Sequence, residues 1–249
     1  MRLPATGSLD LDAPAAPAAP ATPPPVAGSS ALDLDPGPPT PAAAASAPAT
    51  AARRPAAREP RGQRVRAGQQ VLLGVADPAV LLTRVQSGVG QLEFEAACSA
   101  EVGDLRLGAA YQLRSGPTST VQLAGGNRFA PSSRRPVIVA GRDEYEHVRV
   151  DLRQVRDLER MAVYAFSESR AELRWSGTLV VTTAAGGRME LPLEPLYPGR
   201  IAVLASLYNV DGCLVLRAEM ETIAGDVRDA ARAYGYDRIT WRDDRQPVG

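Results

Sequence analysis

The stretch "RIAVLASLYNVDGCLVLRAEM" (residues 200–220) decides the fold class that the sequence predicts. Residues 200–208 are apolar on both faces of an extended chain, which indicates a central strand with cover on each side. A second aliphatic run follows at residues 213–220. The "NVDG" between them (residues 209–212) favours a tight hairpin, because glycine adopts a positive φ at no steric cost. The stretch therefore predicts two long strands joined by a hairpin.

Short β-rich runs separated by turn signals continue on the N-terminal side of this hairpin. Period-two alternation is clearest where Val148, Val150 and Leu152 share one face of an extended chain and Arg149 and Asp151 share the other. Another hairpin is expected at "AAGGR" (residues 184–188), again because of its glycines. The further strands expected are residues 71–75, 80–85, 92–96, 105–113, 120–126, 136–141, 146–152, 160–166, 178–183 and 188–195.

A single helix is expected near the C-terminus. Its apolar residues at helical spacing are Ile223, Val227, Ala230, Ala231 and Tyr234. Gly235 follows as a stop, since glycine takes the left-handed conformation of a helix cap. Many strands and one helix in about 180 residues indicate one β-sandwich or barrel.

The N-terminal quarter of the chain has a different composition. Residues 1–62 contain 14 of the 22 prolines and no Phe, Tyr, Trp or Ile, so they bury too little apolar surface to offset their conformational entropy. We expect a disordered Pro/Ala-rich tail at 1–62, a folded domain at 63–240 and a C-terminal extension at 241–249.

The first residues lack a secretion signal's apolar segment, and no run has the length of a membrane span. Cys98 and Cys213 are too few for a disulfide framework, so a cytoplasmic location is expected.

The residue types exclude several classes of enzyme. All 28 basic residues are arginine, so the chain lacks the lysine of phosphate-binding loops, kinases and Schiff-base enzymes. His147 is the only histidine, which excludes a zinc site built from several imidazoles, and no nucleophile-elbow motif accompanies it. We expect His147 to be a solvent-facing strand residue. The chain is therefore predicted not to be an enzyme. The 28 acidic residues balance the arginines, so no basic surface for nucleic acid is expected.

Three segments resemble the TerD family of tellurium-resistance and stress proteins. They are "EHVRVDLRQV" (146–155), "IAVLASLYNVDGCLVLRAE" (201–219) and "IAGDVRDAARAYG" (223–235). Their order is similar to the family's acidic-x-aliphatic-x-VDL strand, Leu-Tyr-x-x-x-Gly hairpin ending in Arg-Ala, and closing helix before Tyr-Gly; Leu214 stands where the family has tryptophan. The resemblance covers about residues 64–240. It implies an all-β fold, a two-sheet antiparallel β-sandwich with one C-terminal helix.

The resemblance also implies a calcium site built from three acidic segments. "EFEA" (93–96) stands where the family has Asp-x-Asp-Ala, "GGN" (125–127) where it has Gly-Asp-Asn, and "DEYE" (143–146) in place of an acidic turn. Calcium takes about six to eight oxygen ligands, which clustered carboxylates supply. The metal ligands expected from the resemblance are Glu93, Glu95, Asn127, Asp143, Glu144 and Glu146.

An arginine-paired rim is the alternative to a calcium site. Glutamates replace both aspartates of the first segment, Gly126 replaces the aspartate of the second, and Tyr145 interrupts the third. Four arginines lie close in sequence to the last two segments: Arg128, Arg134, Arg135 and Arg142. Such side chains neutralise Glu93 and Glu95 without a metal. Calcium binding is therefore expected to be weak or lost.

Three functions remain open at this point. The first is a non-enzymatic TerD-like module in a bacterial tellurite or general stress response, acting through protein partners and weak calcium binding. The second is a metal-free interaction scaffold whose disordered tail recruits partners; a calcium titration separates the two. The third is a ligand- or carbohydrate-binding sandwich, which needs an exposed aromatic platform for which Trp175 and Trp241 are available.

Overall fold

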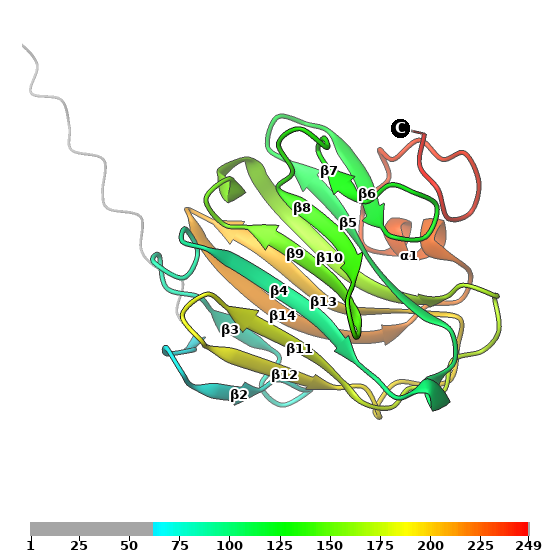
Figure 1. The fold of residues 1–249 in the computed structure, drawn as a ribbon, viewed down its shortest axis with the longest axis horizontal. Coiled ribbons are helices and arrows are strands. Elements are labelled where there is room, and N and C mark those ends of the chain that lie inside the picture. Colours follow the sequence, from blue (N-terminus) through cyan, green and yellow to red (C-terminus); the bar gives the residue numbers. More distant parts are fainter. Residues whose placement is uncertain (1–61, 249) are drawn as a thin grey trace, which may run out of the picture. The chain divides into compact units, whose positions relative to one another are not determined.

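The computed structural model describes residues 62–248. The tail expected at 1–62 lies, apart from Gly62, outside the described residues. The described chain forms two seven-stranded sheets packed as a sandwich, with one α-helix near its C-terminal end (Figure 1). This confirms the fold class predicted from the sequence. Across residues 62–248, no helix has the length and apolar character needed to cross a bilayer.

Sheet A has the strand order β1-β3-β14-β13-β10-β5-β6. Its strands are β1 (Gln63–Arg64), β3 (Ala79–Leu81), β5 (Leu105–Leu113), β6 (Thr118–Gln122), β10 (Leu158–Ser167), β13 (Ile201–Val210) and β14 (Cys213–Thr222). Neighbouring strands are antiparallel except β1 and β3, which run parallel. The central position of β13 agrees with the strand predicted from its apolar sequence.

Sheet B has the order β2-β12-β11-β4-β9-β8-β7. Its strands are β2 (Gln70–Leu72), β4 (Gln91–Ala97), β7 (Phe129–Ala130), β8 (Ile138–Arg142), β9 (Glu146–Asp151), β11 (Thr178–Thr183) and β12 (Arg188–Pro192). β2 runs parallel to β12, and the other pairs are antiparallel. Each of the twelve segments expected to be extended overlaps a strand. β1 and β7, of two residues each, are additional, as are two short 3-10 helices, Ala100–Val102 and Val155–Asp157.

β13 and β14 form the predicted hairpin. Val210 pairs with Cys213, so the turn consists of Asp211 and Gly212, with φ values of 52° and 82°. Positive φ at both turn positions matches the right-handed twist of the flanking strands. Aspartate followed by glycine is one of the few residue pairs that adopt this conformation readily.

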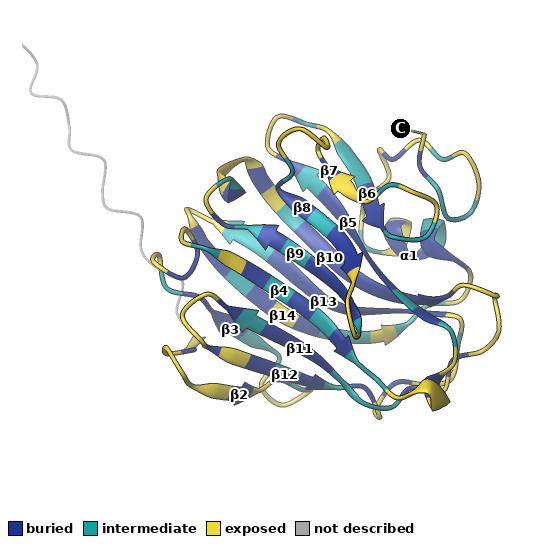
Figure 2. Cartoon of the chain, viewed as in Figure 1, coloured by how far each residue is buried: buried dark blue, intermediate teal, exposed yellow. Residues whose placement is uncertain are grey.

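The first seven residues of β13 are buried whichever face they point to, which explains why this part of the strand is almost entirely apolar. On the inner face, Leu204 and Leu207 join the main core between the sheets. On the outer face, Ile201 and Val203 belong to a smaller cluster with the helix α1 (Val227–Ala233). The central strands are therefore largely buried, whereas most exposed residues lie in the connections and edge strands (Figure 2).

The helix α1 begins later than its apolar spacing indicated. Asp226 is the N-cap: its side chain accepts a hydrogen bond from the N–H of Val227, and Asp229 accepts one from the N–H of Asp226. Because this reciprocal cap satisfies free N–H groups of the first turn, the helix starts there. Ile223 precedes the cap and donates its N–H to a carbonyl of β13. Gly235, with φ of 73°, is the stop that the sequence predicted.

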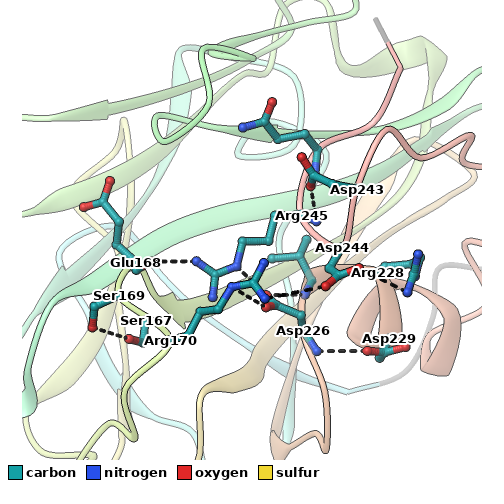
Figure 3. Close-up of polar contacts among 12 residues, drawn as sticks. Ser167, Glu168, Ser169, Arg170, Asp226, Arg228, Asp229, Asp243, Asp244 and Arg245 are labelled. Atoms are coloured by element: carbon teal, nitrogen blue, oxygen red, sulfur yellow. Dashed lines mark hydrogen bonds and ion pairs between the residues drawn. The ribbon is translucent and has the colours of Figure 1, made fainter.

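Residues 241–248, which the sequence set apart as an extension, pack against the domain. Arg245 donates from Nε to Oδ1 of Asp226 and from Nη1 to the carbonyl of Glu168, each at 2.7 Å (Figure 3). The N–H of Arg228 on α1 donates to a carbonyl of the same segment at 2.8 Å. The segment is therefore tied both to the helix and to the chain that follows β10.

Candidate functional site

Glu93 and Glu95 lie on the outer face of sheet B, and each faces a different residue of β9. Glu93 is in register with Arg149, and Glu95 is in register with His147. Arg149 donates from Nε to Oε1 of Glu93 at 2.6 Å and from Nη2 to Oδ2 of Asp143 at 2.8 Å. A cross-strand guanidinium therefore balances Glu93 and joins it to the acidic turn.

This arginine is not one of the four that sequence proximity suggested. Within residues 62–248, no ion pair with Glu93 or Glu95 is formed by Arg128, Arg134, Arg135 or Arg142. Arg149 lies 56 positions from Glu93 in sequence and reaches it because β4 and β9 are paired. The signal that was available is the alternation of β9, which puts Arg149 on the outer face.

His147 is buried, which corrects the expectation of a solvent-facing side chain. It is only 4% exposed, and its ring stands over Gly141, its register partner on β8. A Cβ at position 141 would lie 2.5 Å from Nε2 of the ring, so the glycine makes room for it. Burial lowers the pKa of His147 and the nearby charge of Arg149 lowers it further, against the opposing effect of Asp143.

Glu146 points to the opposite face of β9 from Arg149. It is 5% exposed, and its Oε2 accepts the N–H of Leu107 on β5 at 3.4 Å, which links the two sheets. Its Oε1 is buried without a hydrogen-bond donor; the nearest guanidinium nitrogens belong to Arg106, at 3.6 Å, and Arg142, at 3.9 Å. Burial raises the pKa of Glu146, although the Leu107 hydrogen bond and the two arginines oppose that shift.

Glu146 forms part of the wall of a pocket of about 460 Å³ at this end of the sandwich, which Glu144 and Asp104 also line. Ser167 donates from Oγ to Oδ1 of Asp104 at 2.7 Å, and the N–H of Ser169 donates to Oδ2. Burial alone would raise the pKa of Asp104, but these hydrogen bonds lower it. The pocket therefore presents three carboxylates from two segments of the chain, beside the guanidinium groups that face Glu146.

Cys98 lines the same pocket but has the character of an inert thiol. Burial raises its pKa to about 11, and the charge of Glu194 adds to the shift. A thiol with that pKa is protonated at neutral pH and is a poor nucleophile. The described chain contains no disulfide between Cys98 and Cys213, both of which are free.

The six expected calcium ligands do not form one metal centre. Asn127 lies between β6 and β7, where its Nδ2 donates to the carbonyl of Thr120. The other five divide between the outer face of sheet B and the pocket. In the described part of the chain, no three His, Cys, Asp or Glu side chains are grouped so as to hold a metal ion. These residues do not fit a high-affinity calcium site, which needs several oxygens around one point.

The tryptophans do not form an exposed aromatic platform. Trp175 is buried in the main core. Trp241 is partly buried and packs against the cluster between sheet A and α1. A sandwich that binds sugars by stacking on these two residues is therefore not supported.

Comparison with known proteins gives no family for this chain. No protein-family model matches it, and a search of curated proteins finds no match. The function is therefore inferred from the geometry of the site and from the resemblance of the three segments.

Proposed function

We propose that this protein is a TerD-like, non-enzymatic binding module that works through protein partners in the cytoplasm, in a bacterial tellurite or general stress response. In its acidic rim (Glu93, Glu95 and Asp143), Arg149 pairs with Glu93 and Asp143, and the rim binds calcium no more tightly than about 10⁻⁴ M, the upper affinity of weak extracellular-type modules. The observation that carries the proposal is the Arg149 bridge between Glu93 and Asp143.

The arrangement of the three resembling segments supports this proposal. The first lies in β9 of sheet B, the second is the β13–β14 hairpin of sheet A, and the third contains α1, which packs on the outer face of sheet A. A two-sheet sandwich with a closing helix is the fold that the resemblance implies. Because one fold supports many functions, the chemistry of the rim carries more weight than the fold itself.

Arginine and calcium compete for the same oxygens at this rim. Arg149 occupies one oxygen each of Glu93 and Asp143 at hydrogen-bond distance. Calcium would have to displace a charge-assisted hydrogen bond and remain beside a positive charge that repels it. At the pocket, Arg106 and Arg142 face Oε1 of Glu146 at ion-pair distances of 3.6 and 3.9 Å, without a hydrogen bond.

Calorimetric titration of the full-length protein with calcium tests the role of Arg149. We expect wild-type affinity in the range of about 10⁻⁴ to 10⁻³ M or weaker, and tighter binding in the Arg149→Gln variant, which frees the two carboxylates. Arg232→Gln, at an exposed position on α1, is the matched control and should bind as wild type. Micromolar binding by wild type that is abolished in a Glu93→Gln, Glu95→Gln variant would overturn the proposal.

The β2 edge of sheet B, which no further strand of residues 62–248 covers, supports a role in protein binding. β2 is the edge strand, and Leu72 within it and Val75 just after it are 64% and 89% exposed. An edge strand with apolar side chains offers both backbone groups and apolar area to a partner. We expect stress or tellurium-resistance proteins to cross-link to the wild-type chain in tellurite-treated cells, and a Leu72→Lys, Val75→Lys variant to lose them. Retention of the same identified partners by the variant would exclude this edge.

The second candidate is a metal-free scaffold that recruits partners through residues 1–61. The Arg149 bridge favours it too, because the rim then has no need of calcium. This candidate replaces the first under two conditions. Calcium titration must give no heat of binding with wild type or Arg149→Gln, and removal of residues 1–61 must abolish cross-linking of the partners.

A further inference from the structure

We propose that a second pocket, at the other end of the sandwich, binds a small phosphorylated molecule through arginine side chains. Its volume is about 560 Å³. Four arginines line it: Arg84, Arg114, Arg153 and Arg156. Among the described residues that form its wall, the one acidic side chain is that of Asp211. This excess of positive charge is local, because the whole chain has a formal net charge of zero.

The arginine pocket is remote from the pocket lined by Asp104, Glu144 and Glu146, which is called the acidic pocket below. Its lining includes Arg114, just after β5, and Leu152, just after β9, whereas the acidic pocket includes Leu105 and Glu146 at the starts of the same two strands. β5 has nine residues, which corresponds to about 30 Å of extended chain. The two pockets are therefore separate sites at opposite ends of β5 and β9. Figure 1 shows the course of these two strands.

The floor of the arginine pocket is held by hydrogen bonds. Asn209 donates from Nδ2 to the carbonyls of Val155 and Leu158, at 3.1 and 3.0 Å. Ser87 accepts the N–H of Leu214 at 2.9 Å. These contacts join the turn after β3, the chain before β10 and the β13–β14 hairpin. The backbone segments that carry the arginines are thus held in place, which lowers the entropic cost of binding a ligand.

The arginine side chains keep capacity for a ligand. The Arg156 side chain forms no hydrogen bond or ion pair with any residue of the described range. Arg114 donates from Nη2 to the carbonyl of Asn209 at 2.8 Å, a neutral acceptor that leaves its charge uncompensated. Arg153 is paired with Asp151 at 3.0 Å but is 76% exposed, so an anion reaches it from solvent. The proposal rests on these three arginines and not on Arg84.

The chemistry of the pocket favours a phosphate group on a small molecule. The guanidinium N–H fork matches the oxygens of phosphate, and several arginines suit a multiply charged anion. A concave pocket of this volume falls in the size range of small-molecule sites. Nucleic acid instead requires an extended basic surface, which the balanced charge of this chain does not provide.

Titration of the full-length protein with inorganic pyrophosphate, at an ionic strength of about 20 mM, tests the proposal, since salt screens charges over about 10 Å at 0.1 M. We expect saturable binding that weakens at higher salt. Arg114→Gln combined with Arg156→Gln should weaken it by about tenfold or more, because two charge contacts are lost. Arg232→Gln, an exposed arginine outside the pocket, should change it less than about twofold.

A single Arg156→Glu variant guards against misfolding of the double variant, because the Arg156 side chain is exposed and forms no hydrogen bond or ion pair within the described chain. Absence of saturable pyrophosphate binding, or equal binding by wild type and Arg156→Glu, would overturn the proposal. Titrations with duplex DNA and with anionic phospholipid vesicles identify other sources of phosphate. Tighter binding of either one than of pyrophosphate, lost in Arg156→Glu, would also overturn the assignment to a small molecule.

Discussion

Arg245 donates from Nε to Oδ1 of Asp226 at 2.7 Å, and the two side chains are only 13% and 10% exposed. The same oxygen of Asp226 accepts the N–H of Val227 at 3.0 Å and so caps α1 (Figure 3). The guanidinium also lies over the ring of Phe166, 5.4 Å from its centroid. One buried carboxylate therefore fixes both the start of the helix and the C-terminal segment.

Asp226→Ala should destabilise the protein by about 3–5 kcal/mol, because it removes the helix cap and leaves the Arg245 guanidinium buried without its anion. Urea denaturation measures the change. Arg170→Gln is the matched control: it faces the same carboxylate at 3.8 Å but is 53% exposed, so it should cost less than about 1 kcal/mol. Equal losses of stability in the two variants would show that the buried Arg245–Asp226 pair contributes no more to stability than the exposed Arg170 contact.

Val227→Asp should cost about 3 kcal/mol or more, because Val227 is fully buried in the cluster between α1 and sheet A and the new charge would have no partner. The control is Arg232→Asp at an exposed position of the same helix, where the expected loss is below about 1 kcal/mol. Thermal unfolding compares the three proteins. A Val227→Asp protein that melts with wild type would contradict the docking of α1.

Gly141→Ala should destabilise the fold by about 1–3 kcal/mol, because its Cβ would lie 2.5 Å from Nε2 of His147. In a His147→Ala background the same change should cost less than about 0.5 kcal/mol, since the ring that it strikes is gone. Denaturation of the four proteins of this double-mutant cycle provides the measurement. If the stability losses of Gly141→Ala and His147→Ala were additive, the His147 ring would not need the space that Gly141 leaves.

Glu146 should make stability depend on pH in a defined direction. Its pKa in the folded protein is raised above 4.5, so the folded chain binds the proton more tightly than the unfolded chain does. Its contribution to stability is fully present below about pH 4.5 and is lost as the pH rises through the raised pKa.

Wild type should therefore gain stability relative to Glu146→Gln as the pH is lowered from about 7 to about 4. Denaturation midpoints of both proteins across this range test the sign. Glu101→Gln, at an exposed position, controls for general acid effects. A constant difference between wild type and Glu146→Gln over the whole range would contradict a raised pKa.

Local pattern was sufficient to predict the extended segments and the β13–β14 turn. Side chains of a strand alternate between faces whatever they pack against, and Asp211-Gly212 adopts positive φ by virtue of its own chemistry. The apolar residues at helical spacing in α1 were also predicted, because helical periodicity is likewise a local property of the chain. Its start was placed too early because Ile223 continues the apolar spacing, whereas the free N–H groups are satisfied at Asp226.

The grouping of the six expected calcium ligands depends on strand register, which the local sequence pattern does not give. Sequence proximity suggested four arginines as partners of Glu93, whereas pairing of β4 with β9 supplies Arg149; the four are Arg128, Arg134, Arg135 and Arg142. Glu146 was grouped with Glu93, yet a strand residue three positions from Arg149 faces the other side of the sheet.

The sequence by itself determined an all-β domain with a central hairpin and a closing helix, because periodicity and turn chemistry act between neighbours in the chain. Only the tertiary structure decided which charges meet and which are buried. His147 is buried because Gly141 on the paired strand leaves space for its ring, and Arg245 finds Asp226 because the C-terminal segment folds back on α1. Electrostatic partners and desolvation depend on distances across the fold, and those distances follow from the packing of segments that are far apart in sequence.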